Sequence, residues 1–129
     1  MNEIIKNDIL AVISNAIEIL KVKDKKDIVK LKELSNHAIH NASIFQDEDS
    51  ISITILIYSL SKVIERKFGE IDFKPVLGLL TSAAGYLVKE NIDEYRKIIK
   101  KLFDLISKID SRLKLYIGEV VRQAQIKKG

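Results

Sequence analysis

Cysteine is absent from this chain of 129 residues, and so is tryptophan. Without cysteine the protein cannot form disulfides, thiolate zinc sites or a cysteine nucleophile, and a secreted disulfide scaffold is excluded. We therefore expect a cytoplasmic protein. The abundance of isoleucine and lysine, together with the missing tryptophan, is associated with AT-rich prokaryotic genomes, so a prokaryotic source is expected.

Long hydrophobic runs are missing as well. The most membrane-like stretch, Pro75 to Val88, has no charged residue, but its 14 residues fall short of the ~20 that a membrane-spanning helix needs. The first residues also lack the basic leader and apolar run of a secretory signal peptide. The sequence therefore predicts a buried helix at Pro75 to Val88, and no membrane association.

The remaining composition is that of an ordinary folded protein, with 47% hydrophobic and 31% charged residues. At this length a chain buries about two-thirds of its unfolded surface around one core, so residues 1–129 are expected to form a single domain.

Apolar residues recur at i, i+3, i+4 and i+7 along most of the chain, which is typical of amphipathic helices. All connections between these segments are short. The sequence therefore predicts an all-α, single-domain bundle of about six antiparallel-neighbour helices. The first helix is expected at 2–21, and the second from Asp24 or Asp27 to about Gln46. The third is expected at 51–68, after N-cap candidates in 46–50. The fourth is expected from Pro75 to about Asn91, the fifth from Asp93 through Ile106, and the sixth after a cap at Ser111.

The third of these segments is ambiguous. Isoleucine at 51, 53, 55 and 57 alternates with other residues, which is the period-2 signature of a β-strand. The apolar series continues to Phe68 without a turn residue, and about 18 residues is too long for an ordinary strand. We therefore expect a helix here, apolar nearly all round and central in the bundle.

Small residues form a row in the fourth segment, where Gly78, Ser82 and Gly85 stand at i, i+4 and i+7. Such a row lets another helix approach closely. The alternative is that these glycines are merely tolerated, at a cost of about 1 kcal/mol each relative to alanine.

The only two histidines lie in a polar run within an otherwise apolar helix. At 100° per residue, His37 and His40 point away from the stripe centred on Leu31 that faces the core. Glu33 and Ile44 project the same way. The leading hypothesis is an interaction face for a protein partner or a second copy of the chain, made of Glu33, His37, His40, Asn41 and Ile44.

A metal site is a weaker alternative at the same place. A carboxylate and two imidazoles on one helical face are ligands for a first-row metal ion, with Asp47 as a further candidate. Helical metal sites draw ligands from several helices, however, and this chain has no third histidine. We therefore expect no metal and no other cofactor.

The positive charge is concentrated near the end of the chain. The formal net charge is +4, and residues 96–129 carry 10 lysines and arginines against 3 acids, whereas residues 1–95 carry 12 against 15. The fifth segment sets a basic face opposite its apolar stripe, made of Arg96, Lys97, Lys100, Lys101 and Lys108. Such a face binds phosphates or acidic protein surfaces, but it is also typical of a solvated helix.

Motifs of the common enzymes are missing. The chain has no His-Glu-x-x-His, Gly-x-Ser-x-Gly or Gly-rich phosphate loop. The sequence therefore favours a non-enzymatic module for protein–protein interaction or self-association. The alternatives are a nucleic-acid-binding accessory protein that uses the basic face and the C-terminal tail, and a metal-dependent enzyme centred on His37 and His40.

Overall fold

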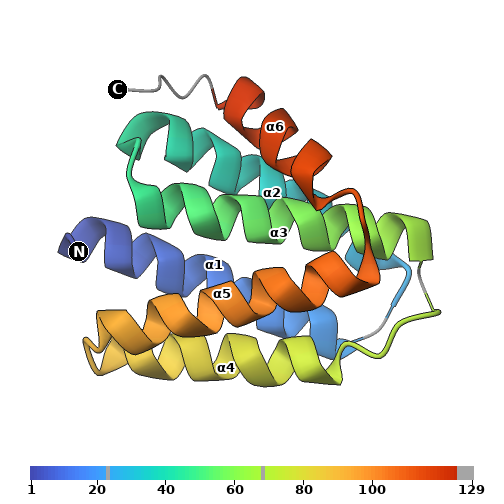
Figure 1. Ribbon diagram of the computed structural model, residues 1–129, viewed down its shortest axis with the longest axis horizontal. Helices are drawn as coiled ribbons and strands as arrows, with labels where there is room; N and C mark the ends of the chain where they lie inside the picture. The colour runs from blue at the N-terminus through green and yellow to red at the C-terminus, as the bar shows by residue number, and fades with distance from the viewer. Residues whose placement is uncertain (23, 68, 125–129) are drawn as a thin grey trace.

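Residues 1–22, 24–67 and 69–124 are described by the computed structural model, and the regular structure among them is entirely helical. The chain is therefore an all-α protein, as predicted. Figure 1 shows the six helices, which are α1 Glu3–Val22, α2 Lys26–Phe45, α3 Glu48–Lys67, α4 Lys74–Val88, α5 Ile92–Ile109 and α6 Leu113–Gln123.

The central element is α3, which contacts α1, α2, α5 and α6. Every residue from 53 to 61 is buried, so the helix is enclosed nearly all round (Figure 1). The prediction of a central helix is confirmed, and the alternating isoleucines have a simple explanation. Ile53 and Ile57 pack in the main core, while Ile55 packs in a second cluster on another side of the same helix. Phe68, at the predicted end of this segment, lies outside the described residues.

Two apolar clusters hold the helices together. The main core draws on α1 to α5, and the predicted stripe of α1 supplies Ile9, Ile13, Ala16 and Leu20 to it. The second cluster joins α2, α3 and α6 through residues that include Tyr116. The fully buried residues of α6 belong to the second cluster, and α3 is the helix that α6 contacts most, so α6 is attached to the bundle chiefly through α3.

Three pairs of helices that follow each other in the chain pack antiparallel: α1 with α2, α2 with α3, and α4 with α5. Within the described residues, α3 and α4 do not form a packed pair, and neither do α5 and α6. Instead α4 packs on α1, and α6 packs on α3. The order of packing therefore differs from a simple up-and-down bundle.

The α2–α3 pair is brought close by small residues. The Thr54 hydroxyl is buried and lies 2.7 Å from the carbonyl oxygen of Ser50 and 3.1 Å from that of Ala38 on α2. A threonine side chain reaches a neighbouring helix backbone only where the two helices approach closely. This contact fixes the register of α2 against α3, and therefore the direction in which the outer side of α2 faces.

Side chains cap the starts of two helices, and the cap of α3 lies among the candidates predicted at 46–50. Asp47 accepts hydrogen bonds from the backbone N–H groups of Asp49 and Ser50, at 3.0 and 3.1 Å, and so caps α3. Asn91 accepts from Glu94 at 3.4 Å at the start of α5. Pro75 lies in the first turn of α4, which suits its fixed φ and missing donor.

The predicted Ser111 cap is wrong. Arg112 stands at the N-cap of α6, and no side chain caps it there. The carboxylate of Asp110 instead accepts the N–H of Arg112 at 3.0 Å, which makes a turn of residues 110–112 before the helix begins.

The fourth helix differs from its prediction in two respects. It is buried on one side only, through Val76, Leu80, Ala83 and Leu87. The small-residue row is exposed on the other side, and a Cβ atom placed on Gly78 or Gly85 would meet no neighbouring atom within 4 Å. No helix of the described chain uses the row for close packing, so that prediction is wrong within this chain.

Candidate interaction face

The outer side of α2 carries the histidines. Glu33, His37 and His40 are all exposed, as their angular positions predict. Ile44, on the same side, is 64% exposed. Burying a β-branched aliphatic side chain with this exposure would stabilise a complex by about 1–2 kcal/mol.

A neighbouring apolar side chain comes from α1. Asn41 donates a hydrogen bond from Nδ2 to Oδ1 of Asp8, at 2.7 Å, and this contact sets the register of the antiparallel α1–α2 pair. Ile4 precedes Asp8 by one turn and Ile44 follows Asn41 by about one turn, so both lie at the same end of the pair. Ile4 is 67% exposed.

Asn41 has a different role from the one predicted. It is half-buried, and its amide is engaged with Asp8. It therefore positions the two helices rather than standing free for a partner.

The middle of the surface formed by these two helices is low in charge, whereas Glu3, Lys6 and Asp8 lie near Ile4 at one end and Glu33 lies towards the other. No residue from 9 to 17 on α1, and none from 34 to 46 on α2, is a lysine, arginine, aspartate or glutamate. In a chain with 31% charged residues this is an uneven distribution. We refer below to the α1–α2 face, defined by Ile4, Ala11, His37, His40 and Ile44, all of which are exposed.

A shallow cleft lies beside this face, between the two helices. Asn15 and Glu18 line it from α1, and Lys30, Glu33 and His37 line it from α2. The cleft therefore brings two of the predicted site residues, Glu33 and His37, to one concave surface.

The predicted metal ligands do not come together. In the described part of the chain, no three histidine, aspartate or glutamate side chains are grouped so that they could hold a metal ion. Asp47 is turned to the first turn of α3, where its carboxylate accepts two backbone N–H groups. Glu33, His37 and His40 share one helix face without a ligand from a second helix, so the geometry lacks a closed coordination sphere.

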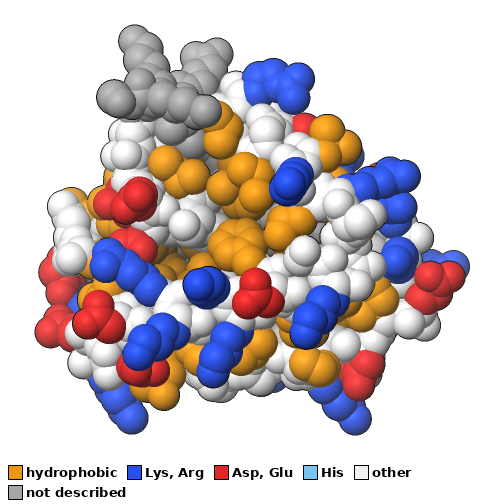
Figure 2. Space-filling view, viewed as in Figure 1, with side chains coloured by type: hydrophobic (Ala, Val, Ile, Leu, Met, Phe, Trp, Pro, Cys, Tyr) orange, Lys and Arg blue, Asp and Glu red, His pale blue; other side chains and the backbone are white. Residues whose placement is uncertain are grey.

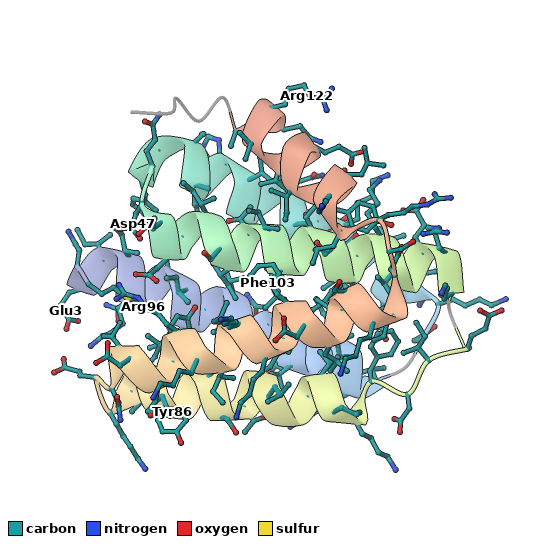
Figure 3. All side chains as sticks on the ribbon, viewed as in Figure 1. Glu3, Asp47, Tyr86, Arg96, Phe103 and Arg122 are labelled. Atoms are coloured by element: carbon teal, nitrogen blue, oxygen red, sulfur yellow. The ribbon has the colours of Figure 1, made fainter. Side chains whose placement is uncertain are left out.

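The basic face of α5 is partly engaged within the chain. Arg96 binds the carboxylate of Asp49 through Nε at 3.1 Å and Nη2 at 2.8 Å, and this hydrogen bonding raises the pKa of Arg96. Lys97 pairs with Glu94 at 3.2 Å. Lysines and arginines form a row along α5 in Figure 2, and Figure 3 labels Arg96.

The other members of the basic face, Lys100, Lys101 and Lys108, are exposed. Arg96 thus ties α5 to the start of α3, and these three lysines are the cations of the face with most freedom to meet a partner. The C-terminal tail, residues 125–129, lies outside the described residues.

A polar network at the base of α6 was missed from the sequence. Asp110 is 4% exposed, and its carboxylate accepts hydrogen bonds from the Tyr116 hydroxyl at 2.7 Å and from Arg66 at 2.8 Å. Burial alone would raise the pKa of Asp110, but these bonds and the Arg112 N–H outweigh it, and the pKa is lowered. The network joins α3, the α5–α6 turn and α6, so it holds α6 in place.

A second connection to α6 starts from Tyr58 on α3, whose hydroxyl donates to Glu119. Burial, followed by the hydrogen bond to Glu119, raises the pKa of Tyr58 to about 12. The contacts of α3 in both connections, Arg66 with Asp110 and Tyr58 with Glu119, link residues far apart in the sequence, so no local pattern predicts them.

No known protein supplies a function by similarity. A scan against protein-family models, a search of curated proteins and a search of solved structures each gave no match to this chain. No helix in the described residues has the length and apolar character needed to cross a membrane. The function must therefore be inferred from the surfaces of the molecule.

Proposed function

We propose that this protein is a non-enzymatic helical module that associates with a second copy of itself through the α1–α2 face. The observation that carries the proposal is the pair of exposed isoleucines, Ile4 and Ile44, at one end of a surface whose middle carries no charged residue. Removing these side chains from water on association is the favourable term.

The low charge of this face favours a second copy as the partner. In a twofold dimer the same surface is present on both subunits, so a charge close to the twofold axis meets its own copy. A neutral surface avoids that repulsion, even though the whole chain carries a formal charge of +4. The polar groups of His37 and His40 can then hydrogen-bond across the interface, as interfacial polar groups generally do.

Light scattering on purified protein tests the proposal. Ile44→Lys should convert a dimer to a monomer, because each copy would bring a charge into a desolvated contact. Lysine near the carboxyl end of a helix suits the helix dipole, so the fold of the single chain should be retained. Ile4→Lys should have the same effect from the neighbouring helix.

Val88→Lys is the matched control. Val88 is 68% exposed, nearly as Ile44 is, and it also lies at the carboxyl end of a helix, but on α4. This variant should remain a dimer. A wild-type protein that is monomeric at high micromolar concentration would refute the proposal, as would a dimer that survives both Ile44→Lys and Ile4→Lys.

The metal hypothesis is tested on the same material. Elemental analysis of protein prepared without a histidine tag should find no stoichiometric transition metal. A bound ion that is lost in His37→Gln and His40→Gln, but kept in Ile44→Lys, would favour a metal site over an interface.

The weaker alternative is a nucleic-acid-binding accessory protein that uses the basic face of α5. Two of the five cations in that face, Arg96 and Lys97, are already paired with acids of the same chain. The predicted basic face is therefore less available to phosphates than its sequence suggests.

A further inference from the structure

A small polar cleft lies where α2, α3 and α6 meet (Figure 1). Every residue that lines it carries a polar group on its side chain, and the three helices contribute, among others, Ser35, Ser61 and Gln123. The cleft encloses about 120 Å³, well below the roughly 300–1,000 Å³ of sites for drug-sized ligands. It therefore suits a small ion, or the terminal group of a larger ligand.

A buried serine at this cleft lacks a hydrogen-bond partner. Ser35 is 2% exposed, and its Oγ forms no hydrogen bond within the described residues. Buried hydroxyl groups are nearly always hydrogen-bonded, because a buried donor without an acceptor is unfavourable. Ser35 lines the cleft, so the cleft is where an oxygen atom of a ligand can reach this hydroxyl.

The packing of α2 against α3 places this serine. The Thr54 hydroxyl contacts the carbonyl oxygen of Ala38, and the two helices are antiparallel. About one turn further along α3 and back along α2, Tyr58 is therefore level with Ser35. Ser61 follows Tyr58 by nearly one turn and is 5% exposed. The two serines thus form the buried side of the cleft.

A half-buried lysine supplies positive charge. The Nζ atom of Lys62 lies 5.3 Å from the centre of the Tyr58 ring, in a cation–π contact. Lys62 forms no ion pair with an acid of the described residues. Because an ammonium group that is partly removed from water is stabilised by a counter-charge, Lys62 favours an anion in the cleft.

The balance of charge around the cleft is positive. Lys32 and Lys62 line it against one acid, Glu65, which is exposed. An adjoining cleft between α3 and α6 shares Lys62 and Glu65 and adds Arg112, which is exposed and has no acidic partner in the described part of the chain. The second acid of that cleft, Glu119, already accepts the hydroxyl of Tyr58.

We infer that the cleft binds a small oxyanion of the phosphate class, either as the free ion or as the terminal group of a larger ligand. Lysine offers three donors and no acceptor, and the serine hydroxyls and the amides of Asn36 and Gln123 also donate. Phosphate oxygens accept such bonds, and lysine binds them as a point charge. A metal cation would meet two lysines. Nucleic acid uses several aromatic platforms, whereas Tyr58 is the one aromatic residue that lines the cleft.

The inference goes beyond the proposed self-association, because it concerns a different surface and a different ligand. Titration of the isotope-labelled full chain with inorganic phosphate, followed by NMR, tests it. Sodium chloride at equal ionic strength is the blank. The backbone amide signals of Ser35, Ser61 and Lys62 should shift and then saturate, with a dissociation constant of about 1 mM or below.

Paired variants examine the buried side of the cleft. Ser35→Ala should weaken phosphate binding by about tenfold, because a hydrogen bond to a charged group is lost. Its stability in urea should not fall, since no hydrogen bond within the described chain is broken. Ser59→Ala is the matched control: Ser59 is buried on α3, but its Oγ contacts the carbonyl oxygen of Ile55 at 2.7 Å. It should bind phosphate as the wild type does.

Charge variants should change the affinity in opposite directions. Lys62→Gln should weaken phosphate binding, because it removes the half-buried cation. Glu65→Gln should strengthen it, because it removes the one acid that lines the cleft. Far-ultraviolet circular dichroism checks that each variant keeps its helices.

Three results would overturn the inference. They are amide shifts that chloride reproduces or that do not saturate, an equal loss of binding in Ser35→Ala and Ser59→Ala, or weaker binding in Glu65→Gln. Adenosine monophosphate distinguishes the two sources of the oxyanion: tighter binding than inorganic phosphate assigns the cleft to the end of a larger ligand, and equal or weaker binding assigns it to the free ion. Ile4→Lys should leave phosphate binding unchanged and Ser35→Ala should leave the dimer intact, so failure of this inference and failure of self-association are distinguished.

Discussion

Replacing Gly78 or Gly85 by alanine should stabilise the protein. Glycine inside a helix is about 1 kcal/mol less favourable than alanine, because it loses more backbone freedom on folding. Both residues are exposed, and an added Cβ would meet no neighbouring atom within 4 Å. Each substitution should therefore add about 1 kcal/mol to the free energy of unfolding. The two sites are about 10 Å apart along the helix, so the double variant should gain about 2 kcal/mol.

Urea unfolding followed by far-ultraviolet circular dichroism measures this gain as a higher midpoint with an unchanged m-value. Gly69→Ala is the control with the opposite sign. Gly69 has a φ of +83°, where an alanine costs about 1–2 kcal/mol, so that variant should be less stable than the wild type. A loss of stability in Gly78→Ala or Gly85→Ala would refute the reasoning, since it would mean that the outer side of α4 is in contact with something in the folded protein.

Three further substitutions test the interior and the caps. Asp110→Asn should reduce stability at neutral pH by about 2 kcal/mol, because Arg66 and Tyr116 lose their charged acceptor. The pKa of Asp110 is lowered in the folded protein, so its carboxylate contributes fully to stability above the unfolded pKa of about 3.9, and this contribution is lost as pH falls through the folded pKa. In urea titrations at a series of acidic pH values, the stability of the variant should therefore fall less steeply with decreasing pH than that of the wild type. Asp47→Ala should cost about 1 kcal/mol by removing the α3 cap while Asp47→Asn restores most of it, and equal losses in both would contradict a capping role. Leu56→Ala should cost about 3 kcal/mol, because Leu56 is fully buried in the main core, and a loss below about 1 kcal/mol in the same titration would contradict that packing.

The sequence predicts local structure well where one physical signal dominates. A repeat of 3.6 residues places the stripe of α1 correctly, and the 100° rotation per residue places His37 and His40 outward, as observed. The α3 segment was harder, because a helix buried on all sides has apolar residues at every position and its periodicity disappears. The length of the apolar series favours a helix over a strand, and this prediction is confirmed.

The sequence does not predict which helices and side chains contact each other when they are far apart along the chain. The fourth segment has apolar residues on one side and small uncharged residues on the other, so its composition alone indicated burial all round. The outer side is exposed because no other helix of the described chain reaches it. Similarly, nothing near Arg96 in the sequence indicates that Asp49, 47 positions earlier, neutralises it. The basic face therefore has less free charge than the sequence predicts.

The uneven distribution of charge determines how self-association should respond to salt. Self-association brings identical surfaces together, so it favours the α1–α2 face, where charge is scarce. Added salt screens exposed charges but leaves the burial of apolar side chains intact. Raising the salt concentration should therefore leave the dimer intact. A dimer that dissociates as the salt concentration rises would mean that the contact depends on charged side chains, and the assignment of the contact to the α1–α2 face would be wrong.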